Sequence, residues 1–413
     1  MKKQENRIPV IRFSEFKATW EHQRLNELLQ VSKEKNKDLK YSKEEVLSVS
    51  GEKGIVNQID HLGRSYAGAS VENYGVVNRG DIVYTKSPLK SNPYGIIKLN
   101  KGLPGIVSTL YAIYKVIEDK ADGQFIEHYF SLNANTNRYL RPLVRKGAKN
   151  DMKINNEYVL HDRIYIPKKE EQKRISVFLN QIGIRINLLK HKRKLMEEYR
   201  EGIVQKIFNQ ELRFNPAKDN TMKEYPDWKE FKVSEVLKKY SNPVDVEIGN
   251  EYNEIGIRSH GKGLFYKKAK SGRDLGNKKV FWLKEDLFIL NIVFAWEGAV
   301  GKTTIKEVGK IASHRFPTFI AKESVLSLDY MLAFFKTRKG LRLLQLASPG
   351  GAGRNKTLSK KDFNNLKVLL PCYEEQCQIS DFFIKINNKI ELITNQINNT
   401  NNYRKSLLQQ MFT

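Results

Sequence analysis

Apolar side chains recur every seven positions in two stretches of the chain, one ending near residue 208 and the other near residue 412. Polar residues occupy most positions between them, a spacing that predicts a long helix with a coiled-coil seam in each stretch. The alternative for each stretch is an ordinary amphipathic helix packed on its own domain. The predicted coiled-coil and subunit-docking positions are Ile175, Phe178, Ile182, Ile186, Leu189, Met196, Tyr199, Ile203, Ile379, Phe382, Ile386, Ile390, Ile393, Tyr403 and Leu407.

The two stretches are copies of each other. At one fixed offset, without a gap, Glu170–Gln172 aligns with Glu374–Gln376, and Phe208 aligns with Phe412. Each copy follows an Ile-Pro or Leu-Pro pair, and proline suits a first helical turn because its missing N–H would be unpaired there. The glutamates come next, where the helix dipole favours negative charge. We infer an internal repeat covering about half the chain, with two similar halves.

The residues between the openings and the long helices predict strand-rich domains. Apolar runs rich in β-branched and aromatic residues, bounded by Gly, Asn and Pro, are typical of strands, and helical segments follow them. The predicted strand regions are 80–84, 105–114, 286–290 and 311–319, and the predicted helical regions are 125–138 and 328–346.

The predicted fold class is therefore α+β, with two similar α/β domains whose middles are strand-rich. We predict the first domain at residues 1–166, the first long helix at 167–213, the second domain at 214–370 and the second long helix at 371–413. The first helix delivers the chain to the second domain, so a second helix that returns along the first would be antiparallel to it. This arrangement gives a pseudo-two-fold repeat. The polar run at 394–402 leaves open whether the second helix is continuous.

The charge balance indicates a polyanionic ligand. The chain has 72 Lys and Arg against 46 Asp and Glu, giving a formal charge of +26 that both halves share. Such a balance in folded domains suggests nucleic acid, the alternative being mere solubility. Two cysteines are too few for a disulfide framework, and no run approaches the roughly 20 apolar residues that span a bilayer. We expect a cytoplasmic protein without a membrane partner.

Catalytic and metal-binding motifs fail at defined positions. Gly298–Thr303 resembles a phosphate-binding loop, but Trp296 stands where that motif needs a glycine. Asn92–Tyr94 lacks the second proline of amino-methyltransferase motifs, and the histidines and cysteines have no zinc spacing. We therefore expect no catalytic residue, no metal and no cofactor in this chain. The alternatives are a stand-alone DNA methyltransferase or nuclease with a divergent site, or a coiled-coil scaffold that binds no DNA.

Both copies of the Pro-x₂-Glu-Glu-Gln-x₂-Ile-Ser core follow a Gly-Ala loop, at Gly147-Ala148 and Gly351-Ala352. This combination resembles the specificity subunit of type I restriction–modification systems, and the resemblance covers nearly the whole chain. It implies two target recognition domains, each reading one half of a split double-stranded DNA site, with the helices forming an antiparallel coiled coil. It also implies docking of two adenine methyltransferase subunits and of restriction/translocase subunits. S-adenosylmethionine, ATP and Mg would then belong to those partners, and this chain would be non-catalytic.

DNA contacts require polar or cationic side chains in loops, with Arg and Lys suited to guanine or phosphate and Asn to adenine. A solvated surface role is the alternative for each candidate. The DNA-binding candidates are Lys86, Ser87, Lys90, Asn92, Tyr94, Lys146, Lys149, Arg258, His260, Lys262, His314, Arg315, Arg354 and Lys356.

Overall fold

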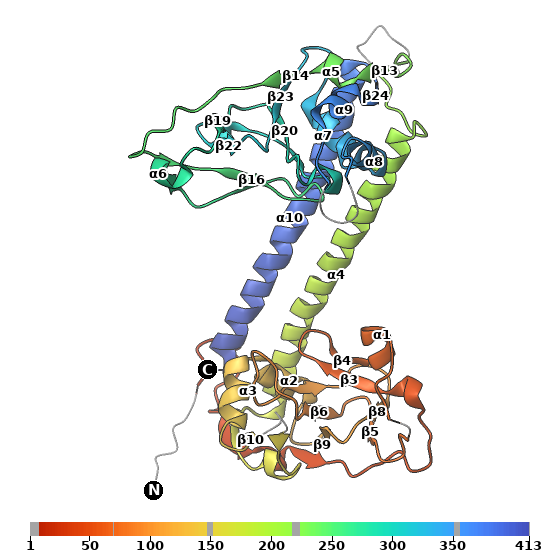
Figure 1. Ribbon diagram of the computed structural model, residues 1–413. Helices are drawn as coiled ribbons and strands as arrows, with labels where there is room; N and C mark the ends of the chain where they lie inside the picture. Colours follow the sequence, from red (N-terminus) through yellow and green to blue (C-terminus); the bar gives the residue numbers. More distant parts are fainter. Residues whose placement is uncertain (1–7, 69, 147–151, 217–223, 351–355, 413) are drawn as a thin grey trace. The chain divides into compact units, whose positions relative to one another are not determined.

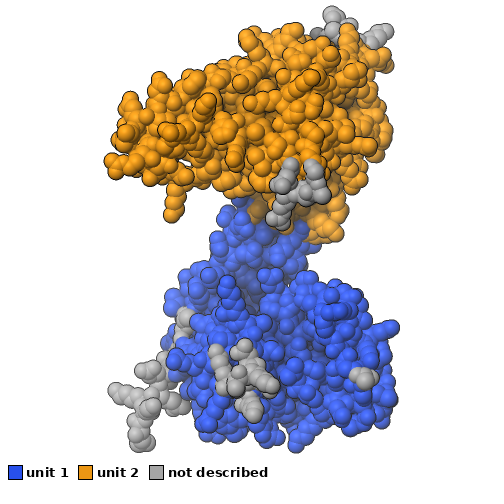
Figure 2. Space-filling view, viewed as in Figure 1, with its two compact units in different colours: residues 1–190, 395–413 blue, residues 191–394 orange. Residues whose placement is uncertain are grey.

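The computed structural model describes residues 8–68, 70–146, 152–216, 224–350 and 356–412 (Figure 1). The chain divides into two compact units, coloured separately in Figure 2. Unit 1 consists of residues 1–190 and 395–413, and unit 2 consists of residues 191–394. Each unit therefore contains one α/β domain together with its share of both long helices.

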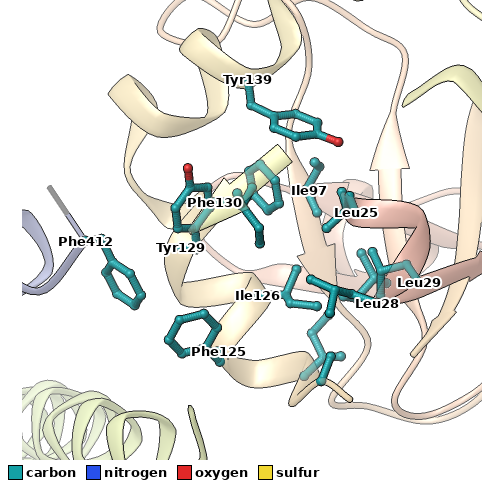
Figure 3. Close-up of a cluster of buried hydrophobic side chains, with 14 of the residues drawn as sticks. Leu25, Leu28, Leu29, Ile97, Phe125, Ile126, Tyr129, Phe130, Tyr139 and Phe412 are labelled. Atoms are coloured by element: carbon teal, nitrogen blue, oxygen red, sulfur yellow. The ribbon is translucent and has the colours of Figure 1, made fainter. Parts of the chain in front are cut away.

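The domain of unit 1 is built on a four-stranded antiparallel sheet. Its elements are β1 (Glu21–Arg24), η1 (Leu25–Glu27), β2 (Leu29–Val31), η2 (Lys43–Glu45), β3 (Leu47–Ser50), β4 (Gly54–Asn57), α1 (Gln58–Leu62), β5 (Gly75–Val77), β6 (Ile82–Thr85), β7 (Ile97–Leu99), β8 (Gly105–Val107), β9 (Tyr111–Val116), α2 (Gly123–Ser131), α3 (Asn133–Leu140), β10 (Arg145–Lys146), β11 (Met152–Lys153), η3 (Tyr158–Leu160) and β12 (Arg163–Ile166). The sheet order is β2-β9-β6-β7. Its core includes Ile97 of β7 and Phe125 and Ile126 of α2, and Phe412 lies against this cluster (Figure 3).

The domain of unit 2 has the same plan. Its elements are β13 (Lys229–Lys232), α5 (Val233–Val236), β14 (Leu237–Tyr240), β15 (Glu251–Tyr252), β16 (Ile255–Ile257), β17 (Leu264–Tyr266), β18 (Lys270–Ser271), α6 (Gly272–Leu275), β19 (Val280–Trp282), β20 (Phe288–Leu290), η4 (Ala295–Glu297), β21 (Val300–Lys302), η5 (Ile305–Glu307), β22 (Ile311–Ser313), β23 (Thr318–Ala321), α7 (Leu328–Phe335), α8 (Arg338–Leu346), α9 (Lys360–Asn365) and β24 (Lys367–Leu370). The four-stranded sheet order is β14-β23-β20-β21.

The duplication extends to the small ladders. β1 pairs with β12 and β13 with β24, so in each domain an early strand closes antiparallel on the strand before the long helix. The β3–β4 hairpin matches β16–β17, and the β5–β8 pair matches β19–β22. Even the isolated parallel bridges correspond, Val46 with Ile106 and Glu254 with Ile311. These matches confirm the predicted fold class and its internal repeat.

Two predicted strand regions are each divided by a turn. The region 105–114 forms β8 and β9, and the backbone N–H of Tyr111 donates to Ser108 O at 3.1 Å between them. The region 311–319 forms β22 and β23, with Phe316 N donating to Ser313 O at 2.8 Å. These turns contain residues with strand propensity. The β-branched and aromatic content of the sequence therefore does not show where one strand ends and the next begins.

The long helices are α4 (Lys169–Phe208) and α10 (Tyr373–Phe412). α10 continues through the polar run at 394–402, where Ile397 is buried and keeps the apolar stripe. In unit 1 the early part of α4, at Ile175 and Leu179, shares a core with the last turns of α10. In unit 2 the last turns of α4 share a core with the first turns of α10. The two helices are therefore paired antiparallel within each unit, as predicted.

The buried stripe keeps the seven-residue spacing that starts at Ile175. The second seam residue lies four positions further on, at Leu179, which was not predicted, and at Ile186, which was. The predicted Tyr199 and Tyr403 are 51% and 55% exposed and lie outside the stripe. A heptad seam alternates steps of three and four, and the aromatic residues three positions on misled the choice of step.

The remaining predicted seam positions divide by burial and by neighbour. Phe178 and Phe382 are partly buried and pack edge-on against Phe13 and Phe214, with ring centroids 5.7 Å and 5.5 Å apart. The fully buried positions are Ile175, Ile182, Ile186, Ile379, Ile386, Ile393 and Leu407, and the partly buried ones are Leu189, Met196, Ile203 and Ile390. Among the described helices, none has a run long and apolar enough to cross a membrane.

Candidate nucleic-acid interface

The start of α4 is fixed to the domain of unit 1 by a buried ion pair. Glu171 is only 2% exposed, and its carboxylate accepts from Arg12 Nε at 2.7 Å and from Arg12 Nη2 at 2.6 Å. The indole Nε1 of Trp20 also donates to Glu171 at 3.3 Å. The hydrogen bond with Glu171 raises the pKa of Arg12 above its ordinary value. A bidentate pair of this kind is geometrically specific, so it sets the direction in which the helix leaves the domain.

The neighbouring Gln172 links the start of α4 to helix α2 of the same domain. The Gln172 side chain accepts from Asp122 N at 2.8 Å and donates to Pro167 O at 2.9 Å. Asp122 is the N-cap of α2, and its carboxylate accepts from Phe125 N and from the Ser176 hydroxyl. The Glu-Glu-Gln motif therefore joins the first turn of α4 to the first turn of α2.

The same arrangement recurs in unit 2. Arg213 donates to the buried Glu375 through Nε at 3.2 Å and Nη2 at 2.7 Å, and this hydrogen bond raises the pKa of Arg213. Gln376 accepts from Ser327 N, the N-cap of α7, and donates to Pro371 O, both at 2.9 Å. Sequence reasoning did not single out the two arginines. Their signal was the Arg-Phe pair at 12–13 and 213–214, which repeats at a slightly different offset from the helices.

Three loops of the domain meet closely in unit 2. The loops joining β16 to β17, β20 to β21 and β22 to β23 are tied by backbone hydrogen bonds. His260 N donates to Glu297 O at 2.8 Å, and Ile292 N donates to Arg315 O at 3.0 Å. Leu358 N reaches the same segment, at 2.8 Å from Ile292 O. Loop residues far apart in the sequence therefore form one continuous edge of the domain.

Exposed cationic and polar side chains lie along this edge. Arg258, His260, Lys262, His314 and Arg315, all predicted DNA contacts, are exposed. The Arg258 guanidinium lies 5.2 Å from the Phe265 ring centroid, and Lys356 Nζ lies 5.5 Å from that of Trp296. Cations held on aromatic faces keep a fixed position while retaining donors for phosphate. The edge therefore suits a nucleic-acid backbone, with side chains left over for base edges.

In unit 1 the loop between β6 and β7, which corresponds to the β20–β21 loop of unit 2, packs against its domain. Asn92 is 4% exposed, and its Oδ1 accepts from the Ser91 hydroxyl at 3.1 Å. Tyr94 packs against the core, and its carbonyl accepts from the Tyr84 hydroxyl at 2.8 Å. These two predicted contacts are structural in this conformation because their side chains hold the loop. The loop has three other predicted residues: Lys90 is exposed, and Lys86 and Ser87 are half-buried.

The glycine loops before the long helices lie largely beyond the described residues. Lys149 and Arg354 fall outside them, and Lys146 ends β10, where its backbone pairs with Met152. Within the described ranges, no group of three His, Cys, Asp or Glu residues could hold a metal ion.

The fold and the basic loops define a class: an internally duplicated chain with two α/β domains, each joined through an Arg–Glu pair to a long helix. Residues 225–401 match the family model described as the type I restriction modification DNA specificity domain. The chain is 24% identical over 290 residues to the type I restriction enzyme MjaX specificity subunit of Methanocaldococcus jannaschii. The alignment covers 65% of this chain and 63% of that relative, which is less than two thirds of the relative's length.

Two solved structures share the fold. The S subunit of the type I restriction–modification system from M. genitalium superposes with a TM-score of 0.57 at 11% identity, covering 98% of this chain and 99% of that one. A chain from a structure of the complex assembly and conformational transition of the type I R-M system gives 0.52 at 15% identity, covering 95% and 97%. Residues 225–401 therefore match a type I restriction modification DNA specificity domain, and the chain as a whole shares the fold of type I specificity subunits.

Proposed function

We propose that this chain is the DNA-recognition subunit of a type I restriction–modification complex, with each α/β domain reading one half of a bipartite double-stranded site. The observation that carries this proposal is the duplicated frame with unlike loops. The Glu-Glu-Gln joints are the same in both units, whereas the loops at the domain edges differ in sequence and conformation. A shared frame with divergent loops suits two readers of different sequences.

We further propose that the duplicated helices dock two adenine methyltransferase subunits, and that restriction/translocase subunits join this core. Exposed apolar side chains on both helices support docking: they include Ile184 and Leu188 on α4 and Leu392 on α10. Surface apolar residues that repeat along a helix are typical of partner contacts. S-adenosylmethionine, ATP and Mg would be bound by the partners, and a DNA ligand implies a cytoplasmic protein.

Native mass spectrometry of the co-expressed chain and methyltransferase tests the stoichiometry. The proposal predicts one specificity chain with two partners, since each half offers an equivalent docking surface. A complex that stops at one partner, even at saturating methyltransferase, would contradict two equivalent surfaces. As a test of role, the chain alone incubated with labelled S-adenosylmethionine and DNA should transfer no label, whereas label transfer without a partner would make it the enzyme.

A further inference from the structure

Unit 1 contains a cleft of about 1280 Å³ between its domain and the two long helices. The β3–β4 turn, β7, α2, the start of α3, α4 and α10 all contribute to its lining, and every lining residue belongs to unit 1. Six lysine and arginine side chains line it against two glutamates: Lys53, Lys98, Lys101, Lys190, Arg404 and Lys405 against Glu52 and Glu127. The cleft is therefore strongly cationic.

Two of these cations are partly buried and form no ion pair with a described residue. Lys101 pairs with Glu127 at 2.6 Å, but neither Lys98 nor Arg404, both partly buried, has an ion pair within the described part of the chain. Burial lowers the pKa of both groups, only partly offset by Glu127. Partly buried, unpaired cations are costly unless a ligand neutralises them.

His128 adds an unused donor to the same lining. It is 2% exposed, and neither ring nitrogen has a hydrogen-bond partner by distance and angle among the described residues. Burial, followed by the charges of Arg404 and Lys101, lowers the pKa of His128 to about 3. The imidazole is therefore neutral at physiological pH and has one N–H to donate.

The first turn of α3 completes the set. Residues 132–135 line the cleft, and the N-cap Leu132 supplies no side-chain hydrogen bond to the amides of the turn. The N–H groups of a helix's first turn and the positive end of its dipole favour a bound anion. Charged, neutral and backbone donors thus surround one space from different sides.

We propose that this cleft binds a phosphate group, with Lys98, Arg404 and His128 as its side-chain ligands. Phosphate is favoured over a carboxylate because several separated donors converge, and a tetrahedral anion has more oxygen acceptors to offer them. The phosphate comes either from a free nucleotide or from the DNA backbone, and only the second source rests on the proposed function. A DNA source is consistent with the fold because the β3–β4 turn, which lines the cleft, corresponds to the β16–β17 turn of unit 2, where Arg258 and Lys262 are exposed.

The corresponding positions of unit 2 carry other residues or contacts. Lys98 stands opposite Val83 in the β6–β7 ladder, and the matching position in unit 2 is Gly301, opposite Ile289. Counting from the N-caps Asp122 and Ser327, His128 corresponds to Ala333. Arg404 corresponds to Arg200, which donates to Asn387 Oδ1 at 3.1 Å. The proposed site is therefore a property of unit 1 alone.

The test is a titration of the full chain with inorganic phosphate, with deoxyadenosine monophosphate and with a duplex oligonucleotide. Histidine NMR reports on His128, whose resonance is assigned by its loss in His128→Gln. Lys98→Gln and Arg404→Gln should each weaken phosphate binding about tenfold, the usual effect of losing a charge-assisted hydrogen bond. Lys98→Arg should restore binding, and Lys173→Gln, an exposed position of α4 outside the cleft, should leave it unchanged.

Saturable shifts of His128 by phosphate and nucleotide, lost in Lys98→Gln, support the site, and weaker duplex binding by the same variant assigns the DNA backbone as its source. A His128 resonance unmoved by all three probes would overturn the proposal. So would a shift produced by poly-glutamate and not by phosphate, which would assign an acidic protein segment instead. If the duplex does not bind anywhere on the chain, the proposed function fails while the phosphate titration still decides the site.

Discussion

The two units share a frame, meaning the side-chain contacts that join each domain to its long helix. They differ in the surfaces next to this frame. In both, an arginine binds the second glutamate of the Glu-Glu-Gln motif, and the glutamine fixes the N-cap of the helix after the sheet. Next to this frame, unit 1 has an open cationic cleft, whereas in unit 2 the cation nearest the matching position, Lys302, is neutralised by Asp286 and Asp329.

This difference shows which residues of the two copies are constrained to keep the same contacts. Side chains that join a domain to its helix must keep the same geometry in both copies, since a buried charge without its partner is severely destabilising. Loops and cleft walls contact ligands or water and are free to diverge. The substitutions below disturb either the shared frame or the unshared surfaces.

The largest expected effect is on the aromatic anchor of α10. Phe412 is 2% exposed, and its ring centroid lies 5.3 Å from that of Phe125 and 5.9 Å from that of Tyr129. Phe412→Ala should lower the free energy of unfolding by about 3–5 kcal/mol, as expected for a large cavity. Urea denaturation measures it, and Tyr403→Ala, an exposed residue of the same helix, should change stability by less than about 0.5 kcal/mol. Equal losses for the two variants would place Tyr403 in the seam after all.

The next effect concerns the joint of unit 1. Arg12→Ala leaves the buried Glu171 without its cation and should cost about 3 kcal/mol in the free energy of unfolding. Arg213→Ala should cost less, because the Arg213 side chain is already 27% exposed and water can enter. Arg174→Ala is the control, since its pair with Glu15 spans 3.7 Å between exposed side chains, and surface pairs contribute under about 1 kcal/mol. If Arg12→Ala lowered the free energy of unfolding no more than Arg174→Ala, the start of α4 would be held on its domain by apolar packing alone.

His128 should make the stability of unit 1 sensitive to pH. Its pKa is lowered from an ordinary value near 6.5 to about 3, chiefly by burial. Below pH 6.5 the unfolded chain binds a proton that the folded chain does not, so stability falls as pH falls, until the folded-state pKa is reached. The slope is at most about 1.4 kcal/mol per pH unit. His128→Gln should lose less stability than the parent between pH 7 and pH 5 in denaturant titrations. Identical slopes would mean that the pKa of His128 is the same in the folded and unfolded chain.

The smallest expected effect is on a single loop cation. Lys262→Ala should weaken DNA binding by the assembled complex nearly equally on all sequences, and should reduce the salt dependence by about one phosphate contact. Fluorescence anisotropy at several salt concentrations measures both quantities. Lys229→Ala, an exposed position of β13, is the matched control. A change confined to one DNA sequence would assign Lys262 to a base rather than a phosphate.

The repeat and the long helices could be predicted from the sequence because periodic burial leaves its pattern in the heptads. Their antiparallel pairing followed from the path of the chain, since the first helix leads into the second domain. The polar run at 394–402 gave no clear expectation, yet α10 passes through it with Ile393 and Ile397 buried. Two well-placed apolar residues and backbone hydrogen bonds are enough to carry a helix across poor helix formers.

Features made by distant residues escaped prediction. The arginines of the joints precede their glutamates by more than 150 residues, so spacing rules do not connect them. Asn92 looked like a base contact because of its type and loop position, but its side chain is buried and braces the loop. The cationic cleft draws on residues from separate strands and helices, and only the fold brings them together.

The central claim is that each domain reads its own half-site on a common frame. Exchanging residues 7–166 for the matching segment of another specificity subunit, co-expressing the product with its methyltransferase and mapping methylated DNA tests it directly. The account predicts that one half of the methylated motif changes while the other half is retained. A change in both halves, or in neither, would contradict it.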